Sequence, residues 1–193
     1  EHISKLSTAV EQSANSIVIT DIDGNIEYVN NRFHEITGYS FDEVVGKNPR
    51  IIKSGIHPEE FYKEIWHTIK NGEIWKGEIC NKKKNNELYW ESSTITPVHN
   101  YKNEICSFIS IKEDITDKRK ATLALKESEE KLRNIFLASP NSIATIDTDG
   151  RIMNCNEAKV NLFGYSWAEL HQMYVLQLFD KKDQKKAKIF WDI

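Results

Sequence analysis

Trp75, Asn81 and Glu91 are three kinds of side chain that together suit the binding of a planar heterocycle. An indole can stack on a flat ring system or pack against its edge. An amide offers a donor and an acceptor to the polar edge of a ring, and a carboxylate accepts from a ring N–H. The alternative is that Trp75 is a core residue and that Asn81 and Glu91 are surface residues of strands.

A second group of polar residues lies near residue 50. Asn48 can contact a ring edge, while Arg50 and Lys53 are cations that can pair with the oxygens of a phosphate-bearing tail. Together with Trp75 and its neighbours, they supply the few polar groups that orient a ligand in an otherwise apolar cavity. A solvated basic patch is the alternative interpretation.

Two histidines permit a different cofactor, haem. Haem iron needs an axial ligand such as histidine. His57 precedes Pro58 in a loop and His67 lies on the helix that follows, so either could serve. Histidines in such positions are usually solvated, and haem therefore stays a minor alternative.

The cysteines suggest neither a metal site nor disulfides. Cys80, Cys106 and Cys155 are odd in number and widely spaced, which fits no zinc site and no disulfide framework. They suit a reducing cytoplasm. We expect no metal site.

The candidate residues belong to the first of two copies of one unit. Residues 13–26 recur without a gap as 139–152, and the same register pairs Asn30 with Asn156. A repeat of this length predicts tandem domains rather than one large core. Function should therefore be sought where the copies differ.

The first copy reads as an α+β domain. Residues 1–12 have apolar residues at helical spacing, and 13–116 contain a hairpin, several short helices and three further strands. These predict a five-stranded antiparallel sheet with a helical flank. The expected strands are 16–20, 26–29, 75–81, 88–97 and 104–112, and the expected long helix is 59–71.

A connecting helix is expected over residues 117–137, which contain neither Gly nor Pro. Its apolar stripe could pack on its own domain or pair with a second chain as a coiled coil. The stripe consists of Leu125, Leu132, Ile135 and Phe136. Residues 138–193 then form the second domain, which lacks the counterparts of the last three strands.

Several motifs in this order resemble the PAS domain with its C-terminal PAC motif. The motifs are Asp21-x-x-Gly24-x-Ile26-x-x-x-Asn30, the break Gly38-Tyr39-Ser40, and Asp114-Ile115-Thr116 after the last strand. The resemblance implies two tandem PAS folds joined by a helix, the second incomplete. PAS domains hold flavin, haem, small acids or nothing, so the fold alone implies no activity.

Further residues make the first copy similar to the FAD-binding PAS domains of aerotaxis, nitrogen-fixation and methane-oxidation redox sensors. The matching positions are Trp66, Asn71-Gly72, Trp75-x-Gly77, Asn81 to Lys84 and Tyr89-Trp90. This resemblance implies non-covalent FAD, with FMN or haem as less favoured alternatives. The residues assigned to the cofactor are Trp75, Asn81, Glu91, Asn48, Arg50, Lys53, Lys112, Trp66 and His57.

The segment 46–50 also resembles the Gly-x-Asn-Cys-Arg stretch of light-oxygen-voltage photosensors. Pro49 stands where those proteins have the reactive cysteine, so the flavin–cysteine photoadduct cannot form. Lys112 aligns with the glutamine that senses the flavin's proton state in that family. The resemblance therefore makes Lys112 a candidate sensor of flavin reduction.

These observations predict a sensory module that is not itself an enzyme. The first domain would sense redox state or oxygen, and the second, without a cofactor, would relay the signal or dimerise. The output, a histidine kinase or a cyclic-dinucleotide enzyme, lies outside this chain. A homodimer is expected. The net charge of −3 does not favour nucleic acid, and no apolar run or signal peptide suggests a membrane. The alternative is a ligand-free interaction module.

Overall fold

The computed structural model describes residues 2–184. The chain divides into two compact units, unit 1 (Glu1–Ala121) and unit 2 (Thr122–Ile193). Unit 1 begins with helix α1 (His2–Glu11), close to the expected N-terminal helix.

The five strands of unit 1 form one antiparallel sheet, as the sequence predicts. Their order is β2-β1-β5-β4-β3, so the first hairpin lies beside the last strand of the unit. The strands are β1 (Ser16–Thr20), β2 (Ile26–Val29), β3 (Trp75–Lys82), β4 (Leu88–His99) and β5 (Ile105–Asp114). The predicted α+β class is confirmed.

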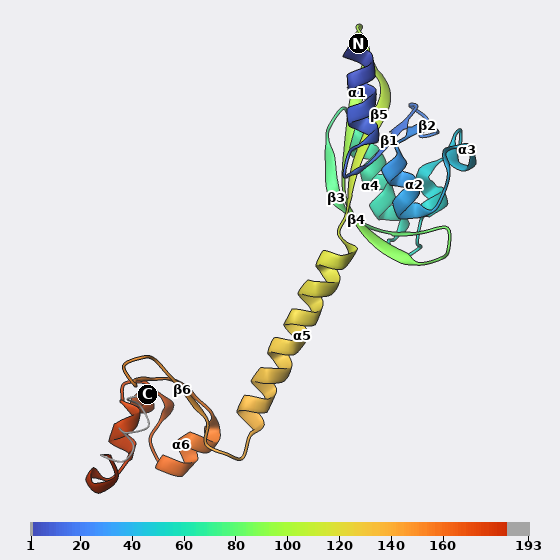
Figure 1. Cartoon of the computed structure of the whole chain (residues 1–193). Helices are drawn as coiled ribbons and strands as arrows, with labels where there is room; N and C mark the ends of the chain where they lie inside the picture. Colours follow the sequence, from blue (N-terminus) through green and yellow to red (C-terminus); the bar gives the residue numbers. More distant parts are fainter. Residues whose placement is uncertain (1, 185–193) are drawn as a thin grey trace. The chain divides into compact units, whose positions relative to one another are not determined.

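The helices between β2 and β3 gather on one face of this sheet (Figure 1). They are α2 (Asn31–Thr37), α3 (Phe41–Val44), the 3-10 helix η1 (Pro49–Ile52) and α4 (Glu59–Lys70). Side chains alternate across a strand, so every second residue of the sheet faces these helices. On β5 these are the buried residues Phe108, Ser110 and Lys112.

The core between sheet and helices consists of two clusters. One includes Val18 and Ile52, and the other gathers around α4 and includes Ile65 and Phe108. Because the two clusters are separate, polar side chains and a cavity can lie between them.

The buried side chain of Asn30 joins the hairpin to α2. Its Oδ1 accepts from the N–H groups of Ile17 at 2.9 Å and Phe33 at 3.2 Å, the latter as a helix cap. Its Nδ2 donates to the carbonyls of Val10 and Asn15. This explains why asparagine recurs at this position of the repeat.

Helix α5 (Thr116–Ala138) follows β5 directly, and the expected bounds 117–137 lie within it. Leu125, Leu132 and Ile135 of its apolar stripe are exposed.

Unit 2 repeats the front of unit 1. It contains β6 (Ala144–Ile146), β7 (Ile152–Cys155), α6 (Glu157–Phe163), α7 (Trp167–Leu170) and η2 (Val175–Leu178). Asn156 caps α6 and hydrogen-bonds the backbone of Asn141 and Ile143, just before β6, much as Asn30 does in unit 1. Residues 185–193, which end the expected second domain, lie outside the described residues.

Candidate ligand-binding cavity

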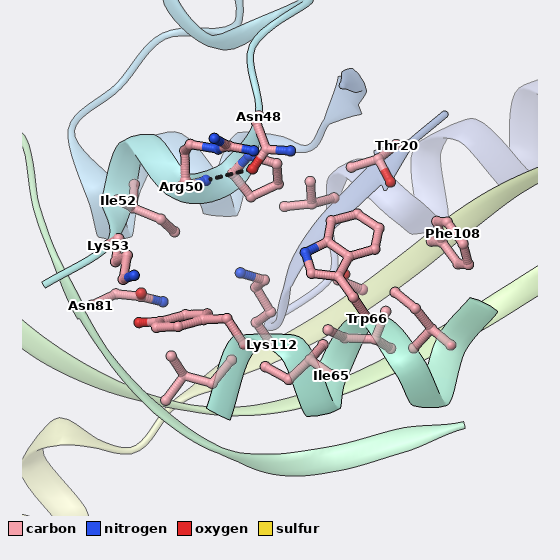
Figure 2. Close-up of a pocket in the computed structure, with 17 residues that line it drawn as sticks. Thr20, Asn48, Arg50, Ile52, Lys53, Ile65, Trp66, Asn81, Phe108 and Lys112 are labelled. Atoms are coloured by element: carbon pink, nitrogen blue, oxygen red, sulfur yellow. Dashed lines mark hydrogen bonds between the residues drawn. The ribbon is translucent and has the colours of Figure 1, made fainter. Parts of the chain in front are cut away.

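Unit 1 encloses a cavity of about 270 Å³ between the sheet, α4 and the segment around η1. Figure 2 shows Lys112 and Trp66 pointing into it, with Asn48 and Arg50 on the opposite side. The volume is close to the lower end of the range for small-molecule sites. Its apolar lining includes Val18, Ile52, Ile65, Trp66, Ile69, Ile79, Ile95 and Phe108.

Trp66 provides the aromatic wall of this cavity. It follows Ile65 on α4, and its ring packs edge-on against Phe108 of β5 at a centroid distance of 5.9 Å. Gly24, in the hairpin turn, lies directly against it: a Cβ there would approach the Trp66 ring to 2.4 Å and Asn48 Nδ2 to 2.9 Å. The hairpin glycine therefore creates space for two cavity residues.

The polar residues expected near residue 50 lie on the side of the cavity opposite Lys112. Arg50 is exposed there, and we call this side, formed by Asn48, Pro49 and Arg50, the mouth. Asn48 caps η1, and its Oδ1 accepts from the Arg50 N–H at 3.1 Å (Figure 2). Pro49 occupies the first position of η1, where its missing N–H costs nothing. Arg50 and Lys53 also line the cavity, and Lys53 Nζ lies 4.2 Å from the centroid of the Tyr62 ring.

The segment after η1 is fastened to the edge strand β3 through both backbone groups of Cys80. Ser54 Oγ donates to the Cys80 carbonyl at 2.5 Å, and the Cys80 N–H donates to His57 Nε2 at 2.8 Å. Lys53 pairs with Asn81 in an isolated β-bridge. We call residues 53–58 the strap.

His57 belongs to this strap and not to the cavity lining. Its ring stacks on Phe61 at 4.3 Å, and its Nε2 is occupied by the Cys80 N–H. In this arrangement Nε2 is not available to haem iron or to another ligand. The structure therefore places His57, which was expected at the cofactor, in the strap and not on the cavity wall.

The floor of the cavity is a buried polar network on the sheet. Lys112 Nζ donates to Glu91 Oε1 at 2.7 Å, and the Tyr89 hydroxyl donates to Glu91 Oε2 at 3.2 Å. Lys112 and Asn81 line the cavity, whereas Glu91 lies behind them. Burial, followed by the charge of Glu91, raises the pKa of Tyr89, so its hydroxyl stays protonated and donates.

Glu91 and Trp75 are thus placed differently from the expectation. Glu91 is buried, accepts from Lys112 and Tyr89, and does not line the cavity. Trp75 packs edge-on against Phe61 at 5.8 Å, and its ring lies so close to Gly77 that a Cβ there would meet it at 2.6 Å. The Trp75-x-Gly77 spacing therefore serves core packing and not a contact in the cavity.

Three cations but no carboxylate line the cavity among the described residues. They are Arg50 at the mouth, Lys53 beside Asn81, and Lys112 at the floor. A cavity lined by these charges favours an anionic ligand.

The comparison with known proteins follows the same division of the chain. Residues 14–117 match the family model of the PAS domain, and residues 130–193 match that of the PAS fold. The chain belongs to the PAS family. The predicted tandem arrangement of PAS domains is confirmed.

The relatives of this PAS chain include sensors. It is 29% identical to the nitrogen fixation regulatory protein of Klebsiella oxytoca over 158 residues. The aligned region covers 82% of this chain and 32% of that protein. It is 25% identical over 122 residues to the aerotaxis receptor of Escherichia coli K12, covering 63% of this chain and 24% of the receptor. The chain thus spans a third or less of these two relatives.

Solved structures support the PAS fold. An RNA-binding light-oxygen-voltage receptor superposes with a TM-score of 0.60 at 22% identity, covering 66% of this chain and 37% of that one. The LOV domain of a blue-light-activated histidine kinase from Erythrobacter litoralis gives 0.50 at 26% identity, covering 54% of this chain and 99% of that one. Taken with the family matches and with the kinship to a nitrogen fixation regulatory protein and an aerotaxis receptor, this makes the chain a PAS sensory signal-transduction module. Within residues 2–184, no helix has the length and apolar character of a membrane span.

The structure adds Tyr62 to the residues of the first PAS domain that could meet a ligand. Its hydroxyl is buried and has no hydrogen-bond partner among the described residues, and it lies on the cavity wall. Burial raises the pKa of Tyr62. Its helical spacing from Ile65, Trp66 and Ile69 was the signal that could have found it.

Proposed function

We propose that the first PAS domain binds FAD without a covalent bond and senses redox state or oxygen. The observation that carries the proposal is the cavity itself, with the Trp66 ring and aliphatic residues on its walls, Asn81 and Lys112 at its floor, and Arg50 at its mouth. The apolar part fits a flat ring system, the floor fits its polar edge, and the mouth fits phosphate. The kinship with a nitrogen fixation regulator and an aerotaxis receptor supports a redox signal.

The proposed chemistry is electron transfer to a bound flavin and not photochemistry through a thiol. Bound FAD would supply reversible reduction. Pro49, at the place of the photosensors' cysteine, lines the cavity and carries no thiol.

The proposed output path begins at β5. Lys112 lies on this strand, which ends at Asp114 and leads through Ile115 into α5 at Thr116. The second PAS domain would relay the signal, without a cofactor, to an output domain such as a histidine kinase. We further propose a homodimer, a cytoplasmic location consistent with three free cysteines, and no catalysis by this chain itself.

A ligand-free interaction module is the second candidate. The exposed side chains of Leu125, Leu132 and Ile135 on α5 favour it, because such a stripe can pair with a second helix. It predicts a dimer that forms equally well without flavin.

The deciding experiment is a titration of the chain with FAD, FMN and riboflavin, followed by absorption and flavin fluorescence. Tight FAD binding, and a spectrum that bleaches with dithionite, would support the proposal. A Soret band in purified protein, or no binding of any flavin, would contradict it.

Two serines of β5 provide matched variants for this titration. Ser110 lines the cavity, so Ser110→Phe should fill it and abolish FAD binding. Ser107 lies on the same strand an odd number of residues away and so faces the other side of the sheet. Ser107→Phe should leave FAD binding intact.

A further inference from the structure

Lys112 is a buried cation whose hydrogen-bonding capacity is incompletely used. Its side chain is 8% exposed, and its ammonium donates to Glu91 Oε1 at 2.7 Å. A lysine ammonium has three N–H donors. No second acceptor for this group occurs among the described residues, so two N–H donors remain on a side chain that lines the cavity.

Glu91 acts as the counter-ion of this lysine. Its carboxylate is 3% exposed, does not line the cavity and accepts from both Lys112 and Tyr89. It therefore balances the lysine charge from behind, while the ammonium faces the ligand space. Within the buried network, negative charge lies on the protein side of Lys112 and none lies on the cavity side.

The rest of the cavity does not neutralise Lys112 further. Its two other charged lining residues, Arg50 and Lys53, are also cations. A ligand with an acceptor at the floor would satisfy the free N–H donors, and a negative charge there would be stabilised more strongly still.

We propose that Lys112 makes the cavity bind reduced FAD more tightly than oxidised FAD by stabilising negative charge on the ring at the cavity floor. The inference rests on the proposed function. Two electrons and one proton convert FAD to the anion FADH⁻; in the test, dithionite supplies the electrons and water the proton. Lys112 keeps its own proton throughout and acts through its charge and its hydrogen bond.

Replacing one or the other member of the ion pair should change the relative affinity for reduced and oxidised FAD in opposite directions. Lys112→Gln removes the cation, so the affinity for reduced FAD should fall relative to that for oxidised FAD, by roughly tenfold or more. Glu91→Gln removes the counter-ion while keeping a partner for Tyr89, so the same ratio should shift the other way. A residue with a merely structural role would not produce opposite shifts.

The experiment measures the dissociation constants of oxidised and dithionite-reduced FAD, and the midpoint potential of bound FAD, for the whole chain and its variants. The potential should become more negative in Lys112→Gln and more positive in Glu91→Gln. Lys102→Gln, which removes an exposed lysine in the turn after β4, controls for net charge and should change neither.

Folding is monitored by circular dichroism. If Lys112→Gln does not fold, the double variant Lys112→Gln/Glu91→Gln replaces the ion pair by two amides. Its potential should still shift to more negative values, though by less than in Lys112→Gln, because Lys112 lines the cavity and Glu91 does not. Failure of the wild-type chain to bind FAD would overturn the proposed function and the inference with it. Binding of FAD with an unchanged ratio in both Lys112→Gln and Glu91→Gln would overturn only the inference.

Discussion

Thr116 and Trp90 exchange two hydrogen bonds at the point where the sheet of the first PAS domain passes into α5. The Trp90 N–H donates to Thr116 Oγ1 at 2.9 Å, and the hydroxyl donates to the Trp90 carbonyl at 3.4 Å. The Arg119 guanidinium lies 4.0 Å from the centroid of the Trp90 ring. The first turn of α5 is thereby attached to the strand that carries Glu91.

Replacing Thr116 by valine should loosen this attachment. The variant keeps the shape but leaves the Trp90 N–H without its acceptor, which should cost about 1–3 kcal/mol of unfolding free energy. Thr116→Ser keeps the hydroxyl and should lose less. Urea unfolding of both variants measures the difference, and hydrogen exchange should show faster opening at the start of α5 in the valine variant. Equal stability of the valine and serine variants would contradict this account.

Gly24→Ala should lower the affinity of the first PAS domain for FAD. Gly24 has a φ of +84°, so any side chain is strained there, and the new Cβ would also displace Trp66 and Asn48 from the cavity wall. Gly150, its counterpart in the second PAS domain, has a φ of +82° but nothing closer to a Cβ than 4.0 Å.

Gly150→Ala is therefore the matched control. Both variants carry the left-handed strain of about 1–2 kcal/mol, but only Gly24→Ala should lower the FAD affinity in a fluorescence titration. Equal FAD affinity of the two variants would show that Trp66 and Asn48 do not contact the ligand.

Removal of the His57 imidazole should release the strap. His57→Ala leaves the Cys80 N–H unsatisfied and removes the stacking on Phe61. Together these losses should lower the free energy of unfolding by about 1–3 kcal/mol. FAD should then dissociate faster, because the strap adjoins the mouth of the cavity. His57→Gln can still accept from Cys80 and should recover part of the loss. Stopped-flow release of FAD after dilution measures the rates; identical rates in wild type and His57→Ala would rule out a closing role.

Acid should remove a contribution of Glu43 to stability. Its pKa is lowered to about 2, first by the hydrogen bond from Lys84 at 2.5 Å and then by the Ser40 N–H at the start of α3. Because the folded pKa lies below the ordinary value of 4.5, the contribution is complete above that pH and disappears between about 4.5 and 2. Glu43→Gln should flatten the pH dependence of the urea midpoint in this window. A slope equal to that of the wild type would contradict the assignment.

Local sequence patterns were sufficient for the elements of the first PAS domain. The hairpin strands were expected at 16–20 and 26–29, and β1 and β2 have these bounds. Turn residues such as Gly24 and the period of two along a strand are properties of neighbouring residues, so they can be read without the fold.

Neighbouring residues do not decide which inward-facing side chain reaches a ligand. Trp75, Asn81 and Glu91 are all buried, as strand periodicity implies, yet only Asn81 lines the cavity. The other two contact residues that are distant in the sequence: Trp75 packs against Phe61 of α4, and the carboxylate of Glu91 forms an ion pair with Lys112 of β5.

By itself, the sequence determined that this protein contains a tandem repeat whose first unit has a five-stranded sheet, because repeats and strand periodicity are properties of neighbouring residues. The ordered motifs of the repeat then gave the resemblance to PAS domains. Only the tertiary structure decided that Tyr62 lines the cavity wall, that Trp75 belongs to the core, and that the Glu91 carboxylate pairs with Lys112. The reason is physical: a cavity is defined by what several elements leave unfilled, and that depends on how α4 and β5 pack together.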